Sequence, residues 1–586
     1  MTFRQPKRRA ALLGLFSGMA LTLAAAAQPP APERPSEWTA KQAASARHRM
    51  VATASPLATD AGDAILRRGG SAVDAAIAVQ MVLNLVEPQS SGIGGGAFML
   101  VHDARRKTLV VYDGRETAPA AARPDRFLDS QGRPLRFFDA VVGGRSVGVP
   151  GTLRMLELAH RRHGRLAWAS LFQPAIRLAE QGFVVSRRLS RAIGAESYLR
   201  QDRARAYFHN ADGTPVAAGQ VIRNPAFAAT LKRIAAEGAN AFYTGEIARD
   251  VVQTADGYTA NPGDLTTADL AAYRARVRMP VCGKYRSYRV CGVPPPSSGG
   301  IAVLQMLGML ERFDMASIGT SDLIGAHLFS EAGRLAYADR DMYVADPDFF
   351  AVPAGLTDRA YLSERSQLIR LDSSIGYAAP GAPPPIAAAG SAAFGQGEAL
   401  ELPSTSHISI VDRYGNAVAM TTTIEDAFGS KLMTAGGFLL NNELTDFSFV
   451  PVDSGRPVAN SVEGGKRPRS AMAPTIVYDA RGRVIVVAGS PGGPAIINYV
   501  AKTLIAILDR RLDPQAAVDL PNIGSRNGPT ELERGTSAEA LASGLEALGE
   551  ATQIVDQNSG LQVIVRTAGR WHGAADSRRE GTVRGD

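Results

Sequence analysis

The chain has 586 residues, of which 45% are hydrophobic and 20% are charged, a composition typical of a globular protein built as several domains or one large layered unit. Its 64 basic and 56 acidic residues give a net charge of +8, and they are scattered along the chain. The lack of a basic stripe argues against nucleic-acid binding, and the 59 glycines follow no triplet period, which excludes a collagen-like chain.

The N-terminus has the pattern of a secretory signal. Three basic residues, 7–9, precede the apolar stretch 10–24, and Ala25-Ala26-Ala27 follows. A positive segment, an apolar segment and small residues in this order are typical of a cleaved signal peptide. We therefore expect residues 1–27 to be removed and the protein to be secreted or periplasmic. The alternative is a retained membrane anchor, because residues 10–27 are just long enough to span a bilayer.

The first part of the chain is predicted to be helix-rich. Apolar residues recur at helical spacing over 59–86 and are interrupted by Gly69-Gly70, which predicts two packed helices. The glycine run 90–96 then enters a strand over 97–102. This run lacks the Lys-Ser/Thr ending of a phosphate-binding loop, so we expect it to allow close backbone approach. Further amphipathic helices are predicted over 151–164, 171–182, 302–313 and 323–343.

The composition changes over residues 376–404 to Ala, Pro and Gly, which predicts a mobile connector. The pattern after it is one of strands. Strands are predicted over 408–412, 417–424, 437–442, 475–478 and 484–489, and a helix over 495–509. We therefore expect a mobile arm that leads directly into the first strand of a sheet.

The chain has two cysteines, Cys282 and Cys291, which flank a predicted hairpin. In an oxidising compartment they could form a disulfide, and two inert thiols are equally compatible with the sequence. Two cysteines and eight scattered histidines offer no metal-ligand spacing. We expect neither a metal nor a cofactor.

A candidate nucleophile lies where the connector meets the sheet, in Ser404-Thr405-Ser406-His407. A threonine hydroxyl inside a chain has no base of its own. Breaking the peptide bond before Thr405 would create an α-amino group on the same residue, and its reference pKa of about 7.7–8.0 suits it to accept the hydroxyl proton. Taken alone, such a Ser/Thr cluster more often only begins a strand.

Other residues favour the catalytic interpretation. Gly492 and Gly493 follow an apolar strand and precede a helix, so their N–H groups can point together at a developing oxyanion. Thr423 lies on the strand that returns beside Thr405. Arg115, just after a strand, could bind a carboxylate in a bidentate manner, and Asp446 is a nearby acid. The combination suits a substrate that carries both a carboxylate and an ammonium group, such as an amino acid.

Seven ordered motifs between Val51 and about Asp576 carry a family resemblance. They are Gly69–Ala76, Gly94–Leu100, Pro294–Gly300, Ser404–His407, Leu439–Glu443, Lys466–Ser470 and Gly489–Gly493. Together they resemble the γ-glutamyltransferases (glutathione hydrolases) of the N-terminal nucleophile hydrolase superfamily. The resemblance implies an α/β (α+β) fold, a four-layer αββα sandwich built from both subunits of a self-cleaved precursor. Cleavage between Ser404 and Thr405 would leave a large subunit, 28–404, and a small subunit, 405–586, as a heterodimer that forms one catalytic domain.

The resemblance also assigns roles to residues by motif position. The catalytic set is Thr405, Thr423, Gly492 and Gly493. The substrate-binding set is Arg115 and Ser470 for the α-carboxylate of the donor, with Glu425, Glu443 and Asp446 for its α-amino group. The implied reaction transfers the γ-glutamyl group of glutathione and related compounds, through an ester on Thr405, to water, an amino acid or a dipeptide.

The chain departs from the family pattern in three places. Many members have Asn where this chain has Glu425, and a second serine usually follows Ser470, where this chain has Ala471. The loop 447–465 contains no tyrosine, the residue that closes a lid over the donor in some members. We therefore expect altered donor selection and an open or differently shaped acceptor side.

Three other functions compete with this one. Gly144-Arg145-Ser146-Val147-Gly148 matches the nucleophile elbow of serine hydrolases, but Pro150-Gly151 follows at once and no strand-turn-helix context surrounds it. A cephalosporin or glutaryl acylase of the same fold is a closer alternative, because Ala471 alters the donor pocket. The third is a periplasmic amino-acid-binding protein that uses Arg115 and Asp446 without turnover.

Overall fold

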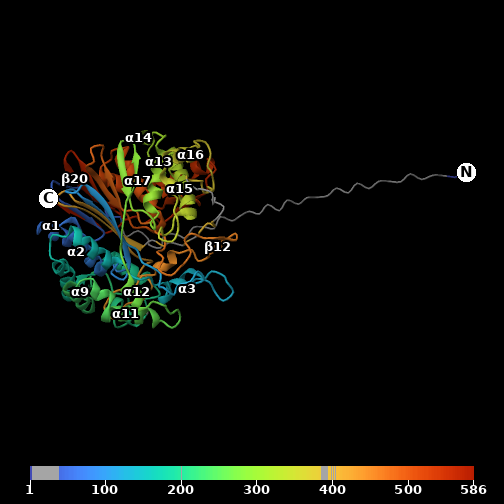
Figure 1. Ribbon diagram of the computed structural model, residues 1–586. Helices are drawn as coiled ribbons and strands as arrows, with labels where there is room; N and C mark the ends of the chain where they lie inside the picture. The colour runs from blue at the N-terminus through green and yellow to red at the C-terminus, as the bar shows by residue number, and fades with distance from the viewer. Residues whose placement is uncertain (3–37, 200, 385–393, 398, 400–401, 403) are drawn as a thin grey trace.

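The computed structural model describes residues 1–2, 38–199, 201–384, 394–397, 399, 402 and 404–586 (Figure 1). Apart from its first two residues, the predicted signal segment lies outside these residues, and so does much of the predicted connector between 385 and 403. Among the described residues, no helix combines the length and the apolar character that crossing a bilayer requires.

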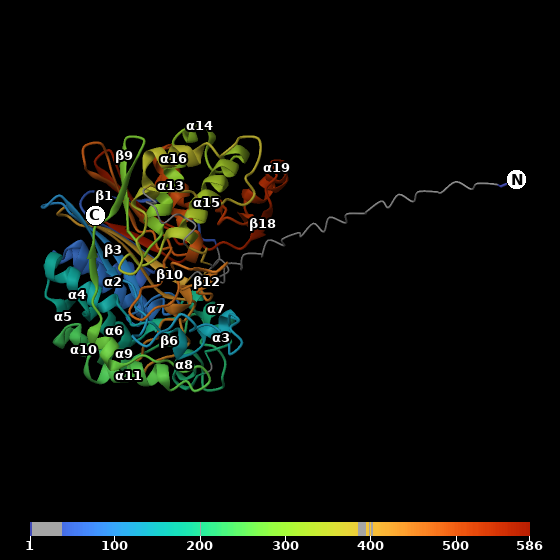
Figure 2. The same ribbon diagram turned by 45° about the vertical axis from the view of Figure 1, so that its right-hand side comes forward.

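Two seven-stranded sheets lie at the centre of this mixed α/β structure (Figures 1 and 2). The first contains, in spatial order, β1 (Ala44–Ala46), β20 (Arg570–Ala575), β19 (Gln562–Thr567), β15 (Val484–Gly489), β14 (Thr475–Tyr478), β9 (Tyr288–Gly292) and β8 (Val281–Tyr285). The second contains β21 (Thr582–Gly585), β2 (Met50–Thr53), β10 (Ser404–Val411), β11 (Ala417–Glu425), β3 (Gly96–Asp103), β4 (Thr108–Gly114) and β7 (Arg276–Arg278). Neighbouring strands in both sheets run antiparallel.

The two sheets pack against each other through β10 and β11 of one and β15 and β19 of the other. Because alternate residues of a strand point to opposite faces, the side chains of β10 contact the helices on one side and the other sheet on the other. Ile408 and Ile410 belong to the apolar core on the helix side. His407 and Ser409 point the other way, where the Ser409 hydroxyl donates to the carbonyl of Gln562 at 2.9 Å. Thr405 has the same parity as these two and therefore faces the other sheet.

Helices cover the outer faces of the sheets (Figure 1). On the second sheet lie α1 (Pro56–Arg67), α2 (Ala72–Val86) and α4 (Thr152–His163), with α6 (Gln173–Gln181) against α2. On the first lie α13 (Gly299–Leu310) and α17 (Ile496–Leu508), with α15 (Leu323–Tyr343) against α13. The predicted break at Gly69-Gly70 is confirmed, because α1 ends at Arg67 and α2 begins at Ala72. A capping box between Ser71 and Asp74 marks the start of α2. The helical and strand periodicities therefore located these elements correctly.

The remaining elements lie around this centre, and apart from α9 and α11 they are short. The other helices are α3 (Phe137–Val141), α5 (Trp168–Leu171), α7 (Arg187–Ala195), α8 (Asp202–Phe208), α9 (Pro225–Glu237), α10 (Asn240–Tyr243), α11 (Gly245–Asp256), α12 (Thr267–Ala272), α14 (Met315–Ile318), α16 (Arg359–Ser366), α18 (Pro514–Asp519) and α19 (Ala542–Ala547). The small sheets pair β5 (Phe183–Val184) with β6 (Val221–Ile222), β12 (Val452–Asp453) with β13 (Arg456–Pro457), and β16 (Ile523–Gly524) with β17 (Thr530–Glu533) and β18 (Thr552–Val555).

The predicted strand over 437–442 is wrong. The segment makes a single bridge, between Met433 and Leu439, and otherwise runs irregularly. The reason is that β11 already pairs with β10 on one edge and with β3 on the other, so no free edge remains for a third partner. The segment instead folds back on itself through the turn at 434–438.

The two cysteines lie directly opposite each other in the β8–β9 hairpin. The structure joins the Sγ atoms of Cys282 and Cys291 in a disulfide. The bridge lies at the outer edge of the first sheet, where β8 is the edge strand and β14 separates β9 from β15.

Candidate active site

Thr405 lies within β10 and not at its border, because the strand begins one residue earlier, at Ser404. The pairing with β11 is irregular here: Ser404 is opposite Glu425 and Thr405 is opposite Thr423, so Ile424 is an extra residue. Such a bulge bends the strand and redirects side chains. The peptide bond between Ser404 and Thr405 is therefore placed at a local distortion of an otherwise regular, buried hairpin.

Three groups around this peptide bond form a chain of hydrogen bonds. The Thr405 hydroxyl donates to Thr423 Oγ1 at 3.2 Å, and the Thr423 hydroxyl donates to the carbonyl oxygen of Ser404 at 2.8 Å. The Glu425 N–H donates to Thr423 Oγ1 at 2.9 Å. Since a hydroxyl has one proton, these contacts orient the Thr423 proton toward the Ser404 carbonyl. Thr423 thus contacts both the candidate nucleophile and the carbonyl that this nucleophile would attack.

One small cavity brings together most of the predicted site residues. Its volume is about 20 Å³, enough for one water molecule but too small for a glutamyl group. Its walls are Arg115, Leu402, Thr405, Thr423, Glu425, Glu443, Asp446, Ser470, Ala471, Met472, Gly493 and Ile496. Leu402 belongs to the segment before Thr405, so the uncut chain itself forms one wall of the site.

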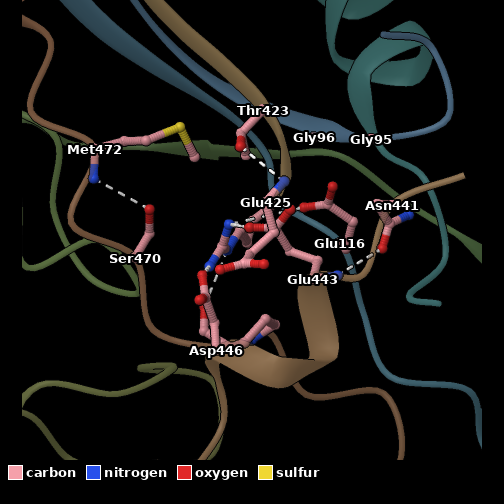
Figure 3. Close-up of polar contacts among 12 residues, drawn as sticks. Gly95, Gly96, Glu116, Thr423, Glu425, Asn441, Glu443, Asp446, Ser470 and Met472 are labelled. Carbon is pink, nitrogen blue, oxygen red and sulfur yellow. Dashed lines mark hydrogen bonds and ion pairs between the residues drawn. The ribbon is translucent and has the colours of Figure 1, made fainter. Parts of the chain in front are cut away.

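Arg115 lies at the centre of an ion cluster in this cavity. Figure 3 shows its two acidic partners, Glu443 and Asp446. Its Nη1 pairs with Glu443 and its Nη2 with Asp446, two residues that the short helix η4 (Glu443–Asp446) presents three positions apart. The guanidinium also donates to the carbonyls of Pro468 at 3.1 Å and Arg469 at 2.6 Å. Burial would lower the pKa of Arg115, but the carboxylates outweigh it and raise that pKa above its usual value. In the uncut chain the predicted carboxylate-binding group is therefore already neutralised by the predicted ammonium-binding groups.

Glu425 lies on the other side of the same cavity. One carboxyl oxygen accepts the N–H of Leu402 at 2.9 Å, and the other accepts the side-chain amide of Asn442. Burial, followed by the nearby carboxyls of Asp446, Asp426 and Glu443, raises the pKa of Glu425 well above its usual value. The carboxyl that the sequence assigns to a substrate ammonium thus binds a backbone N–H of the chain's own preceding segment.

Glu116 is a component of the site that the sequence interpretation missed. Its side chain is fully buried beside the Arg115 cluster (Figure 3). The neighbouring glycines explain how it fits: a Cβ at Gly96 would overlap the Glu116 carboxyl group, and one at Gly148 would lie 2.9 Å from Glu116 Cβ. An Arg-Glu pair in a sequence usually indicates a surface ion pair, so only burial reveals this role.

The glycine run allows close backbone approach, as the sequence predicted. A Cβ at Gly94 would collide with the Leu439 carbonyl, and one at Gly95 with the Thr423 carbonyl. Asn441 completes this contact, since its side chain donates to the carbonyls of Gly94 at 2.7 Å and Gly148 at 2.9 Å. The motif containing Asn441 thereby holds η4 close to β3 and β11.

Gly492 and Gly493 form the turn between β15 and α17. Both have positive φ angles, +135° and +54°, which favour glycine. A Cβ at Gly492 would lie 2.5 Å from the ring of Tyr499. Gly493 lines the cavity with Thr405, whereas Gly492 is not among the lining residues.

Ser470 lines the cavity beside Ala471, and its hydroxyl accepts the N–H of Met472 at 3.1 Å. The motif 294–300 fixes its position. Ser298 donates through both its N–H and its hydroxyl to the Ser470 carbonyl, each at 2.7 Å, and the Ser470 N–H donates to Pro296 at 3.1 Å. This motif, read only as a family feature in the sequence, therefore fixes the position of Ser470 in the wall of the cavity.

One further candidate, Ser146, is placed elsewhere. The Ser146 hydroxyl is buried and donates to the carbonyls of Val141 at 2.6 Å and Gly143 at 3.1 Å, so it serves the backbone of its own turn.

One group of described side chains has the spacing of metal ligands: His327, Glu331 and Glu550. Arg334 lies among them, with Nε 2.9 Å from Glu331 and Nη2 3.2 Å from Glu550. The guanidinium supplies the positive charge there, and the cluster is a buried ion network that joins α15 to the C-terminal part of the chain.

Comparison with known proteins agrees with this geometry. The model of the gamma-glutamyltranspeptidase family matches residues 58–585. The chain is 38% identical over 558 residues to a glutathione hydrolase proenzyme of Bacillus subtilis, with 93% of this chain and 92% of the relative covered. It is 36% identical to the glutathione hydrolase proenzyme of Escherichia coli, with 97% of each covered. A cephalosporin acylase from Bacillus halodurans has a similar structure, with a TM-score of 0.81, 27% identity and coverage of 94% of this chain and 97% of that chain. The chain belongs to the gamma-glutamyltranspeptidase family.

Proposed function

We propose that this protein is a self-cleaving γ-glutamyl transferase and hydrolase that acts on glutathione and related γ-glutamyl compounds. The observation that carries the proposal is the shared cavity, in which the Thr405 hydroxyl faces the cluster of Arg115, Glu443 and Asp446. A nucleophile beside one guanidinium and several carboxyl groups suits an acyl donor that carries an α-carboxylate and an α-ammonium group. The names of the relatives, glutathione hydrolase proenzymes, support the same substrate.

The first reaction is self-cleavage. Thr405 Oγ1 attacks the carbonyl carbon of Ser404, and Thr423, which donates to that carbonyl oxygen at 2.8 Å, stabilises the developing negative charge. The C–N bond breaks, the nitrogen of Thr405 takes up the proton that its hydroxyl group gives up, and Ser404 is left as an ester on Thr405 Oγ1. Water hydrolyses this ester and frees the α-amino group of Thr405. The products are a large subunit that ends at Ser404 and the small subunit 405–586, held together in an αββα sandwich to which both contribute.

The second reaction is turnover. The α-carboxylate of the donor binds Arg115 in place of Glu443 and Asp446, with Ser470 beside it. Glu443 and Asp446, together with Glu425, then bind the α-ammonium group of the donor. Leu402 must leave first, because its N–H binds Glu425 and its side chain forms a wall of the cavity. Cleavage and departure of this segment therefore open the donor site.

Acyl transfer then follows on the mature nucleophile. The free α-amino group of Thr405 accepts the hydroxyl proton as Oγ1 attacks the γ-carbonyl carbon of the donor. The N–H groups of Gly492 and Gly493 stabilise the oxyanion, and the amine leaves with a proton. Water, an amino acid or a dipeptide then takes the γ-glutamyl group from Thr405. We place the enzyme outside the cytoplasm because of the signal-like pattern of residues 1–27, which would be removed on export.

The test is intact-mass analysis and N-terminal sequencing of the purified protein, together with the Thr405→Ala variant. We expect two fragments from the wild type, the smaller beginning with Thr405, and release of p-nitroaniline from γ-glutamyl-p-nitroanilide. Thr405→Ala should remain one uncut chain without turnover, whereas Ser146→Ala should retain both processing and activity. Activity in Thr405→Ala would overturn the proposal. An uncut wild type that binds glutamate stoichiometrically would instead support the binding-protein alternative.

A second candidate function is that of a glutaryl or cephalosporin acylase. The observation that favours it is Ala471, which lines the cavity where a second serine would otherwise contact the donor. The similar structure of a cephalosporin acylase supports it as well. The ratio of kcat/KM for γ-glutamyl- and glutaryl-p-nitroanilide separates the two, because the glutaryl donor lacks the α-ammonium that Asp446 would bind. A ratio below one would favour the acylase.

A further inference from the structure

Glu116 has an environment that none of the proposed steps requires. Its side chain is completely buried, and neither carboxyl oxygen accepts a hydrogen bond from an N–H or hydroxyl group among the described residues. Its nearest cationic atom is Arg115 Nη1, 4.0 Å away, which is too far for a hydrogen bond. An ionised carboxylate in such a place would be a buried charge without compensation. Glu116 is therefore neutral and carries its proton.

Glu443 is the carboxyl group beside Glu116, because Glu116 Oε2 lies 4.0 Å from the same Arg115 Nη1 that pairs with Glu443 Oε1. Glu443 Oε2, like both oxygens of Glu116, has no hydrogen-bond partner among the described residues. Since Glu443 makes the contact ion pair with Arg115, it is the ionised member of the pair and can accept the proton of Glu116. The other polar groups near Glu116 are already engaged. Tyr273, which follows α12, donates its hydroxyl proton to the carbonyl of Arg115 at 2.7 Å, and Tyr243 of α10 donates to Pro150 at 2.9 Å. Arg115 Nη1 is paired with Glu443, and Glu116 Oε2 lies 4.0 Å from this same nitrogen.

Glu443 is thus held from two sides, by a cation and by a neutral acid. We propose that Glu116 is a positioning residue whose carboxyl proton is donated to Glu443, so that Glu443 stays aimed at the α-ammonium of the γ-glutamyl donor after Arg115 turns to the donor's carboxylate. The inference rests on the proposed function, because it concerns the donor site of that same reaction. It adds a requirement that Glu116 be protonated.

The charge environment supports this requirement. Burial raises the pKa of Glu116 to about 8, against the opposing effect of Arg115, and Asp446 adds to the rise. Burial likewise raises the pKa of Glu443 to about 8, with Arg115 lowering it and Glu116 raising it. The two carboxyl groups titrate as a pair, and the first proton to be lost leaves one shared proton between them. Burial also raises the pKa of both Tyr243 and Tyr273, so these phenols stay neutral over the same range.

The pH dependence follows with a definite sign. Below about pH 8 the shared proton holds the two carboxyl groups together. As the pH rises through this value, Glu116 ionises and the hydrogen bond is replaced by repulsion between the two carboxylates. Glu443 is then no longer held in the orientation that binds the α-ammonium group of the donor. The KM for a γ-glutamyl donor should therefore rise between pH 7.5 and pH 9.5.

The experiment compares Glu116→Gln with Glu116→Leu in the mature enzyme, with γ-glutamyl-p-nitroanilide as the donor. The glutamine amide donates to Glu443 as the acid does but cannot ionise, so KM at pH 7 should stay within about threefold of the wild type and should rise less than in the wild type up to pH 9.5. Leucine fills the space without a donor, so KM should rise about 10- to 100-fold, as expected for a lost hydrogen bond to a charged group. Both proteins meet the same donor, so titration of the donor's own ammonium cancels in the comparison.

A matched control is Glu246→Gln, the same change at an exposed position of α11. Its pH profile should coincide with that of the wild type. If Glu116→Leu does not fold or cleave itself, the profiles of the wild type and Glu116→Gln decide the question alone. Identical profiles for these two proteins, or equal KM values for the Gln and Leu variants, would overturn the inference while leaving the proposed function intact. A wild type without activity on γ-glutamyl donors would instead refute the proposed function.

Discussion

The Thr423→Val substitution tests the self-cleavage step most directly. Valine has nearly the shape of threonine and favours strands, so β11 should keep its pairing with β10 and β3. What is lost is the hydroxyl that accepts from Thr405 at 3.2 Å and donates to the Ser404 carbonyl at 2.8 Å. That carbonyl oxygen becomes negative in the transition state, so the lost bond matters more there than in the uncut ground state.

The size of the effect follows from the geometry. Removing one donor that stabilises an oxyanion costs about 2.7–4 kcal/mol, which corresponds to about 100- to 1,000-fold in rate. The Glu425 N–H donates to Thr423 and not to the carbonyl, so it cannot replace the lost donor without moving. We therefore expect Thr423→Val to cleave itself at least about 100-fold more slowly than the wild type.

The assay follows the conversion of purified precursor into two fragments by gel electrophoresis and intact mass. Thr422→Val is the matched control, because this neighbouring hydroxyl makes only a 3.4 Å contact with the Gly96 carbonyl. Equal cleavage rates for the two variants would show that Thr423 does not act on the scissile carbonyl. A loss of thermal stability confined to Thr423→Val would also refute the reasoning, since it would assign the effect to folding.

Other substitutions test the remaining parts of the site and of the fold. Gly492→Ala places a methyl group 2.5 Å from the Tyr499 ring at a φ of +135°, so turnover of γ-glutamyl-p-nitroanilide should fall at least about 100-fold; near-normal kcat would contradict the assigned oxyanion turn. Arg115→Lys removes the forked contacts to two carboxylates, so donor KM should rise about 10-fold or more, and an unchanged KM would argue against the carboxylate-binding role. Glu550→Gln removes the carboxylate that binds His327 and leaves buried Arg334 with Glu331 alone, so it should lower the free energy of unfolding by about 3–5 kcal/mol in thermal or denaturant melts. Burial lowers the pKa of His327, but its hydrogen bonds to Glu550 and a backbone carbonyl outweigh this and raise it, so the loss should be largest below about pH 6.5 and shrink as the pH rises through the raised value. A loss independent of pH would exclude the His327 contribution.

Local patterns predicted the hairpin that carries the nucleophile. The turn after β10 is made by neighbouring residues, because the Asp412 carboxylate accepts the N–H groups of Tyr414 and Asn416, and Gly415 takes a positive φ of +85°. A turn of this kind sets the register of the two strands, and the register places Thr405 opposite Thr423. Sequence reasoning could therefore pair these two threonines without a structure.

Sequence reasoning was less successful where a segment's partners are distant in the chain. The run 437–442 has strand-like composition, yet both edges of β11 are occupied by β10 and β3. Competition for a sheet edge is decided by the whole topology, which a local pattern does not contain. The same holds for Asn441, whose contacts with Gly94 and Gly148 span hundreds of residues.

The sequence by itself determined the family, the order of the main helices and strands, and the residue types that perform the chemistry, because motifs, turns and periodicities are local. Only the tertiary structure decided the state of the proposed donor site. It neutralises Arg115 with Glu443 and Asp446 and places a segment of the uncut chain against Glu425. It also buries Glu116 where no N–H or hydroxyl group of the described part of the chain donates to its carboxyl oxygens. The physical reason is desolvation: whether a carboxyl group is a surface charge or a neutral buried acid depends on what surrounds it, and those surroundings come from separate parts of the chain.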